Sequence, residues 1–184
     1  HLGDLGHRSA LIMDAGQSLV SSDERVRGFE DRWCNFPGAR VVRTGGGFTY
    51  EGGRAAVKPF VSQLESGEIT AIFAVNDLMA LGVLEVLLEA QIAVPDSVSL
   101  VGFDDSSQGH FARPRLTTVQ QDVVAMGAAA VHALVNFIER ASDKDSREAE
   151  KREVLPVSLI VRESSGPVRS SETMSGLGNG GGDS

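Results

Sequence analysis

The stretch from Thr70 to Asp105, TAIFAVNDLMALGVLEVLLEAQIAVPDSVSLVGFDD, limits the fold of this chain more than any other part of it. The apolar run Ala71–Val75 predicts a buried strand, the longer run over about Asp77–Ala90 predicts a helix, and Ser97–Gly102 predicts a second strand. Two strands joined through a crossover helix lie parallel in one sheet. This segment therefore predicts an α/β fold built on a parallel sheet.

The part of the chain before this segment shows the same alternation. Ala10–Met13 and Arg40–Arg43 predict two strands, separated by a helix that one of the polar residues 21–23 would cap. A second helix is expected over about Tyr50–Glu65, and Pro59 inside it should kink or split it because proline has no backbone N–H. Strands alternating with helices of this length indicate a doubly wound, mostly parallel sheet.

The two ends of the chain carry different signals. The first seven residues, HLGDLGH, are typical of the end of a helix stopped by Gly6, and they indicate that the chain starts inside a larger protein. Apolar residues at helical spacing predict a late helix over about Val124–Ile138, and a last strand is expected over Val154–Val161. Residues 164–184 are rich in Gly and Ser and are expected to be disordered, with no role in the fold.

Composition excludes several classes of function. The formal net charge of −8 gives no general attraction for phosphate backbones, so this chain alone is not expected to bind DNA. Cys34 is the only cysteine, which excludes disulfides within one chain and Cys-based zinc sites. The four His residues lack metal-ligand spacing, no apolar run reaches the roughly 18 residues of a membrane span, and no Gly-x-Ser-x-Gly elbow is present. We expect no catalytic residues, no metal and no cofactor.

Polar pairs stand just past the ends of the two central strands. In open α/β sheets this is where small ligands bind. Asn76 and Asp77 can both act as helix caps, or one can cap while the other turns into the cleft. Asp104 and Asp105 are neighbours in an extended segment and should point to opposite sides, which favours a single ligand-binding carboxylate over an acid–base pair. Capping of the loop is the alternative for this second pair.

Two further side chains are candidates for the same site. Arg25 lies near the start of its helix, where positive charge opposes the helix dipole, so it is either a solvated arginine or a donor of two parallel hydrogen bonds to a ligand. Phe48 follows a run of glycines and is a loop aromatic, a core residue of the next helix or a platform for a flat ligand face. The glycines do not match a phosphate-binding loop.

The helix Asp77–Ala90 is apolar nearly all round, whereas a helix on one face of a sheet needs only one apolar stripe. Either it is buried inside the monomer, or its outer face forms a subunit interface. For the second case we predict a homodimer with contributions from Leu78, Leu81 and Leu84, and from Phe111 in the loop Ser106–Arg115.

Seven motifs, in their order along the chain, resemble the LacI/GalR family of bacterial transcription regulators: HLGDLGHR, RVRGF, GGFTYEGG, AVNDLMALG, VPDSVSLVGFDD, PRLTTVQQD and LPVSLIVRES. The resemblance implies a two-lobed domain of the periplasmic-binding-protein-like type I fold, represented here mainly by its C-terminal lobe. Family members bind a small effector, often a sugar or nucleobase, between the lobes, and they dimerise to grip operator DNA. By the same resemblance, the ligand-contacting positions are Arg25, Phe48, Asn76, Asp104 and Gln121.

The resemblance also divides the chain into segments. Residues 1–121 would form the C-terminal lobe, 122–140 a helix of the N-terminal lobe, 141–152 a charged linker, 153–163 a final strand returning to the C-terminal lobe, and 164–184 the tail. The helix-turn-helix domain and most of the first lobe would lie outside this chain. Operator DNA would therefore be a partner only through that missing N-terminal domain.

The resulting expectation is the ligand-sensing and dimerisation domain of a cytoplasmic transcription regulator. Its effector would be a sugar or a nucleoside-like compound. The alternative is a sugar-binding protein of a transport system, which shares the fold. A secretory signal would favour the transport protein, and an upstream helix-turn-helix sequence would favour the regulator. An enzyme ranks third, because the sequence carries no catalytic constellation.

Overall fold

A four-stranded parallel sheet forms the centre of the molecule. The computed structural model describes residues 1–16, 19–141 and 153–168. The strand order is β2-β1-β3-β4. The strands have these bounds: β1 Ser9–Asp14, β2 Arg40–Gly45, β3 Ala71–Ala74 and β4 Ser99–Val101. In register, Leu11 of β1 lies beside Val42 on one side and Ile72 on the other. The predicted α/β fold with a mostly parallel sheet is confirmed.

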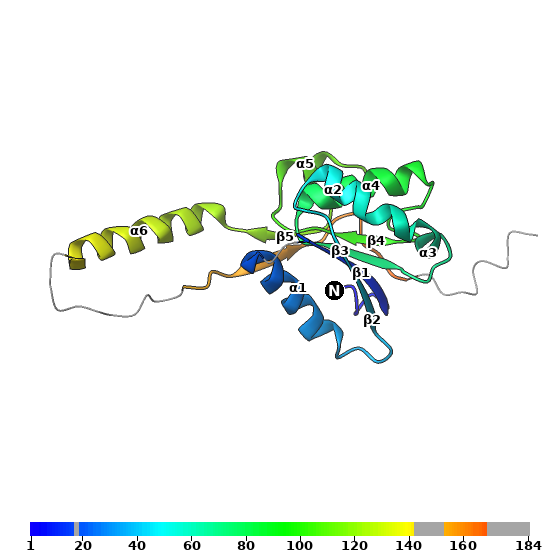
Figure 1. The fold of residues 1–184 in the computed structure, drawn as a ribbon, viewed down its shortest axis with the longest axis horizontal. Helices are drawn as coiled ribbons and strands as arrows, with labels where there is room; N and C mark the ends of the chain where they lie inside the picture. Colours follow the sequence, from blue (N-terminus) through cyan, green and yellow to red (C-terminus); the bar gives the residue numbers. More distant parts are fainter. Residues whose placement is uncertain (17–18, 142–152, 169–184) are drawn as a thin grey trace, which may run out of the picture.

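Helices cover both faces of the sheet. Helix α1 (Val20–Trp33) lies on one face, and α2 (Tyr50–Val57), α3 (Val61–Glu65) and α4 (Asp77–Glu89) lie on the other, as Figure 1 shows. Sheet strands and inward helix faces enclose a core in which Leu11, Ile72 and Leu87 are fully buried.

Proline divides the second helix as predicted. Helix α2 ends at Val57, and the turn of 3-10 helix Lys58–Phe60 separates it from α3. The predicted cap of α1, in contrast, is wrong. The residue before the helix is Leu19, which provides no side-chain cap. Ser22 is buried, and its hydroxyl instead accepts a hydrogen bond from the backbone N–H of Ala15.

A two-stranded ribbon extends from the edge of the sheet beyond β4. Strand β5 (Thr118–Gln121) pairs antiparallel with β6 (Val157–Ile160). Single parallel bridges, Val101 to Thr117 and Asp104 to Gln120, connect the β5 chain to the end of β4 and the residues after it. The short helix α5 (Ser107–Phe111) interrupts the loop between β4 and β5.

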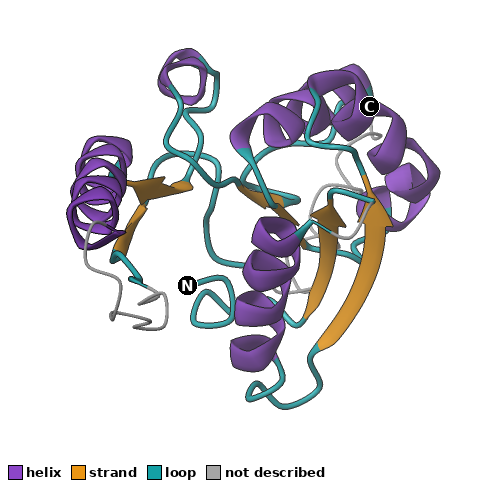
Figure 2. Cartoon of the chain, turned by 60° about the vertical axis from the view of Figure 1, so that its left-hand side comes forward, coloured by secondary structure: helices purple, strands orange, loops and turns teal. Residues whose placement is uncertain are grey.

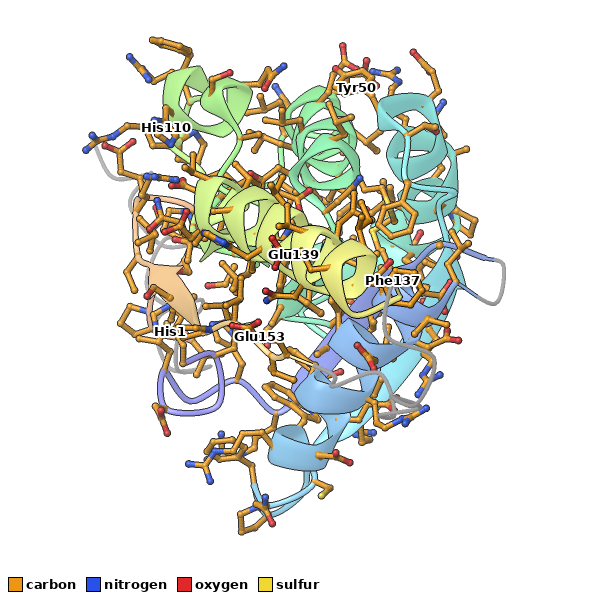
Figure 3. All side chains as sticks on the ribbon, turned by 90° about the vertical axis from the view of Figure 1, so that its left-hand side faces the viewer. His1, Tyr50, His110, Phe137, Glu139 and Glu153 are labelled. Atoms are coloured by element: carbon orange, nitrogen blue, oxygen red, sulfur yellow. The ribbon has the colours of Figure 1, made fainter. Side chains whose placement is uncertain are left out.

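Helix α6 (Val123–Ala141) follows the ribbon and extends away from the rest of the molecule (Figure 1). Figure 3 looks from the side on which α6 extends and shows Phe137 and Glu139 on the helix in front of the sheet. Its large apolar side chains are exposed: Val123, Val124, Met126, Val131, Leu134, Val135, Phe137 and Ile138. Such a surface is expected of a helix that packs against a further structural unit.

The prediction that residues 164–184 have no role in the fold is wrong for residues 164–168. Ser164 is fully buried, and its hydroxyl donates to the carbonyl of Leu100 in β4. The Gly166 carbonyl accepts from the buried ring of His7 at 3.0 Å and from the hydroxyl of Ser99 at 3.1 Å. The prediction rested on the Gly- and Ser-rich composition of the whole segment. Small residues are also able to pack closely beside a strand, as Ser164 and Gly166 do here. Residues 142–152 of the predicted linker and residues 169–184 lie outside the described part.

Candidate functional site

Arg25 is fixed at the carboxyl-terminal edge of the sheet. It lies in the second turn of α1, from which its guanidinium reaches across to the end of β3. There Nη1 donates to the Val75 carbonyl at 2.6 Å and to the Asp104 carboxylate at 3.2 Å. The guanidinium carbon stands 3.9 Å from the centre of the Phe103 ring, a cation–π arrangement. Arg25 is thus an oriented donor and not a solvated arginine.

Asp104 connects this arginine to the ribbon. Its Oδ1 accepts from Arg25 and also from Gln121 Nε2 at 2.7 Å. Burial raises the pKa of the Asp104 carboxyl, and the neighbouring Arg25 opposes that rise. Burial also lowers the pKa of Arg25, against the attraction of Asp104. For both groups the effect of burial on the pKa exceeds that of the neighbouring opposite charge.

Asp105 turns away from Asp104 and holds a separate network. Both residues have a positive φ, 118° for Asp104 and 56° for Asp105, which L-residues seldom adopt. Asp105 accepts from Arg162 at 2.6 Å, from Gln120 at 2.9 Å and lies 2.9 Å from the His110 ring. Burial tends to raise the pKa of Asp105, but the hydrogen bonds from Arg162 and His110 outweigh it and leave that pKa lowered. The two carboxylates therefore do not face one substrate bond.

Asn76 and Asp77 are both used inside the fold. Asn76 Oδ1 caps α4 by accepting from the N–H of Met79, and its amide nitrogen donates to the Phe48 carbonyl at 3.0 Å. Asp77 is buried and accepts from the Thr118 hydroxyl at 2.6 Å and the Ser106 N–H at 2.7 Å. The capping interpretation of Asn76 is confirmed. Asp77 does not turn outward, because it anchors the β4–β5 loop.

Phe48 is half-buried, has a φ of 59° and packs against the hydrophobic core. The five candidate residues thus fall into two linked groups. Arg25, Asp104 and Gln121 are joined by side-chain hydrogen bonds, whereas Phe48 is joined to Asn76 through its backbone. The bond from Arg25 to Val75, the residue before Asn76, brings the groups together at one edge of the sheet. A ligand role for each residue stays a prediction.

A groove of about 660 Å³ opens beside Arg25 and Gln121. It also has aromatic walls: Phe29, Trp33 and Phe36 from the α1 segment, Phe73 from β3, and Phe103 from the turn after β4. Asn76, Phe48 and Asp104 do not line it. Sequence reasoning missed this groove. The four-residue spacing of Phe29 and Trp33 was visible, but nothing in the sequence indicated that Phe29 would stack on Phe73, with ring centres 5.1 Å apart.

The residues predicted at a dimer interface differ in exposure. Leu78 is 43% exposed and Phe111 is 79% exposed, so both offer apolar surface. Leu81 is half-buried. Leu84 is only 4% exposed and packs in the core, so it offers almost no surface to a partner. The homodimer itself stays a prediction.

Two further properties concern only the part of the chain that the structure describes. It contains no group of three or more His, Cys, Asp or Glu side chains placed to hold a metal ion. None of its helices combines the length and apolar character needed to cross a membrane.

Comparison with known proteins identifies the family. The family model of a periplasmic binding protein-like domain matches residues 1–165. A regulator encoded in the aml 5′ region of Streptomyces limosus is 41% identical over 145 residues, which are 75% of this chain and 40% of that protein. In a solved complex of the transcriptional regulator CelR with cellobiose, the matching chain is 32% identical with a TM-score of 0.77, and the match covers 89% of this chain and 48% of that one.

A LacI family regulator from Mycobacterium smegmatis has the same fold, with a TM-score of 0.80 at 22% identity; the match covers 92% of this chain and 61% of that one. This chain spans 40–48% of the length of the curated relatives it matches. The chain belongs to the LacI family of transcription regulators and carries part of their periplasmic-binding-protein-like, effector-binding domain.

Proposed function

We propose that this chain senses a small, hydroxyl-rich effector, a sugar or a nucleoside-like compound, for a transcription regulator. The observation that carries the proposal is the cluster of Arg25, Asp104 and Gln121 at the carboxyl edge of the parallel sheet. It provides a fixed donor, a charged acceptor and an amide that both donates and accepts. Such a set matches the alternating donors and acceptors of neighbouring hydroxyl groups.

The site is half-open. The side chain of Asp104 is 37% exposed, so its second carboxylate oxygen can meet a ligand while the first holds Arg25 and Gln121 in place. Side chains held by one another need little reordering when ligand binds. The cellobiose complex of CelR supports a carbohydrate as the class of effector.

The partners follow from the same proposal. The complete protein would bind operator DNA through segments outside this chain, because the chain's net charge of −8 disfavours a phosphate backbone. Exposed Leu78 and Phe111 support a homodimer through α4 and the α5 loop. The complete regulator would act in the cytoplasm.

Calorimetry on the complete protein with a panel of sugars and nucleosides tests the proposal. With the tightest ligand, Asp104→Ala and Arg25→Ala should each lose about 1.5–3 kcal/mol, or roughly ten- to a hundredfold in affinity, because a charged hydrogen-bond partner is removed. Arg43→Ala is the matched control, since Arg43 pairs with Glu30 on an exposed surface outside the cluster. If both site variants bind as tightly as the control, the site assignment is wrong.

A further inference from the structure

Two consecutive aspartates in the turn after β4 have an unusual backbone conformation. Asp104 has a φ of 118° and Asp105 a φ of 56°, a range in which residues with a side chain are uncommon. Residues in such conformations persist where the surrounding structure holds them, and they cluster at ligand sites. The contacts of this turn therefore decide where its two carboxylates point.

Strand β5 holds the backbone of the turn and meets both of its side chains. The N–H of Asp104 donates to the Val119 carbonyl at 2.8 Å, and a parallel bridge joins Asp104 to Gln120. Neighbouring residues of a strand point to opposite sides. Gln121 donates to Asp104 at 2.7 Å on one side, in the effector cluster. Gln120 donates to Asp105 at 2.9 Å on the other side.

Arg162 fixes the second carboxylate. It follows β6, which lies on the near side of the ribbon beside the N-terminus in Figure 2, and its Nη2 donates to Asp105 Oδ1 at 2.6 Å. Its Nη1 donates to the Leu116 carbonyl and its backbone N–H to the Thr117 hydroxyl, both at 2.9 Å. The side chains of Arg162 and Asp105 are 14% and 8% exposed, so the pair is largely shielded from water. A planar guanidinium held at several points is a rigid donor.

Asp105 itself is not placed to meet a ligand. Its Oδ1 accepts from Arg162 and lies 2.9 Å from His110 Nε2, and its Oδ2 accepts from Gln120. Both oxygens are thus occupied, whereas the Asp104 side chain is 37% exposed. These contacts hold the turn in the conformation that directs the Asp104 carboxylate.

We propose that Asp105 and Arg162 are positioning residues for the effector: their ion pair holds the turn after β4 so that the Asp104 carboxylate faces the ligand. This role rests on the proposed function, because it concerns the same effector site. Without the ion pair the turn would relax toward negative φ, and the Asp104 side chain would swing away from Arg25 and Gln121. Neither positioning residue would touch the ligand.

The alternative is an ion pair that only ties the chain after β6 to the body of the molecule. Loss of such a tie would lower the melting temperature and leave the Asp104 cluster unchanged. The bond from Arg162 to the Leu116 carbonyl would serve the tie alone. The two positive φ values favour the positioning role, because the turn needs a partner for the Asp105 side chain to keep this conformation.

The side-chain amide of Gln121 reports the direction of Asp104 without any ligand. Its NMR signals can be followed in the ¹⁵N-labelled 184-residue chain, in which the amide donates to a charged oxygen. In Arg162→Ala these signals should move most of the way to the position of an exposed glutamine amide. Arg162→Lys keeps the charge and should retain part of the native shift. Asp105→Asn removes the charge at constant shape, and it decides the question if Arg162→Ala does not fold.

Arg115→Ala is the matched control. Arg115 pairs with Glu163, the residue next to Arg162, and the side chains of this pair are 54% and 47% exposed. Its loss removes an arginine from the same region without touching the turn. The Gln121 signals should therefore stay at their native position in this variant.

Calorimetry on the complete protein gives the functional readout, with cellobiose, lactose and ribose as probes. Arg162→Ala should bind the tightest of these sugars about tenfold more weakly than wild type, because the site must then be ordered by the ligand, whereas Arg115→Ala should bind it equally well. If the wild type binds none of the three, the carbohydrate part of the proposed function fails, and the Gln121 signals still decide the positioning role.

Three results would overturn the positioning role. One is a lower melting temperature in folded Arg162→Ala or Asp105→Asn with native Gln121 signals, which would leave a purely structural tie. Another is an equal displacement of these signals in Arg115→Ala. The third is a folded Arg162→Ala variant that binds the sugar as tightly as wild type.

Discussion

Removal of residues 166–184 should destabilise the protein, whereas removal of residues 169–184 should not. The longer deletion removes the Gly166 carbonyl, which accepts from His7 Nε2 and from the Ser99 hydroxyl, and the Gly166 N–H, which donates to Ser99 at 3.0 Å. It also removes the bond from the Val168 N–H to the Leu5 carbonyl.

The expected cost follows from which groups lose partners. His7 and Ser99 are 1% and 0% exposed, and each buried polar group left without a partner costs about 1–3 kcal/mol. Their direct contact at 3.0 Å can satisfy part of this loss, so a total of about 2 kcal/mol is reasonable. At about 2–4 °C per kcal/mol for a chain of this size, the melting temperature should fall by roughly 4–8 °C.

Thermal unfolding followed by circular dichroism measures the difference between the two deletions. The deletion of residues 169–184 is the control, since it removes none of these bonds. Equal melting temperatures for both shortened chains would refute the argument that residues 166–168 stabilise the fold.

Three further predictions concern single side chains. Burial lowers the pKa of His7 below 6.5, so the unfolded chain takes up a proton on this ring more readily than the folded chain. The stabilisation from neutral His7 is therefore full above pH 6.5 and is lost as the pH falls through the native pKa. Urea unfolding between pH 5 and 7 should show a free energy of unfolding that falls with pH, and this fall should be weaker in His7→Gln. Asp77→Ala should lower the free energy of unfolding by about 2–4 kcal/mol, since the buried Thr118 hydroxyl and the Ser106 N–H lose a charged acceptor; an effect under about 0.5 kcal/mol in denaturant titration would contradict this. Phe111→Glu should shift sedimentation of the complete protein toward monomer with little change in melting temperature, whereas Leu84→Glu should unfold the chain by burying a charge; a stable monomeric Leu84→Glu variant would contradict its place in the core.

The sequence was sufficient to predict the elements that carry strong local signals. Helix α4 and strand β3 stand out because a long apolar run follows a short one, and Pro59 marks the break between α2 and α3. A helix stop was also predicted at Gly6, because glycine readily adopts a positive φ, and in the structure Gly6 has a φ of 95°. Strand order was not predictable from such signals, because pairing depends on contacts between distant residues.

The meeting of the candidate residues at one edge of the sheet was predictable from the sequence, but their hydrogen-bond partners were not. Asn76 and Asp104 were predicted as site residues because they follow the ends of two strands, and a parallel sheet brings the carboxyl ends of its strands to one edge. Which carboxylate faces Arg25 depends on the backbone turn at Asp104 and Asp105, which no local pattern specifies. The role of Gly166 in the fold was not predicted, because it lies in a Gly- and Ser-rich segment whose composition is typical of disorder. Its contacts with His7 form only in the folded chain.

The most direct test of the central claim is a crystal structure of the complete protein with the ligand that calorimetry identifies. Hydroxyl groups of the ligand should lie within hydrogen-bond distance of Asp104 and Arg25, at the carboxyl edge of the sheet. A ligand that touches neither Asp104 nor Arg25 would contradict the proposed site.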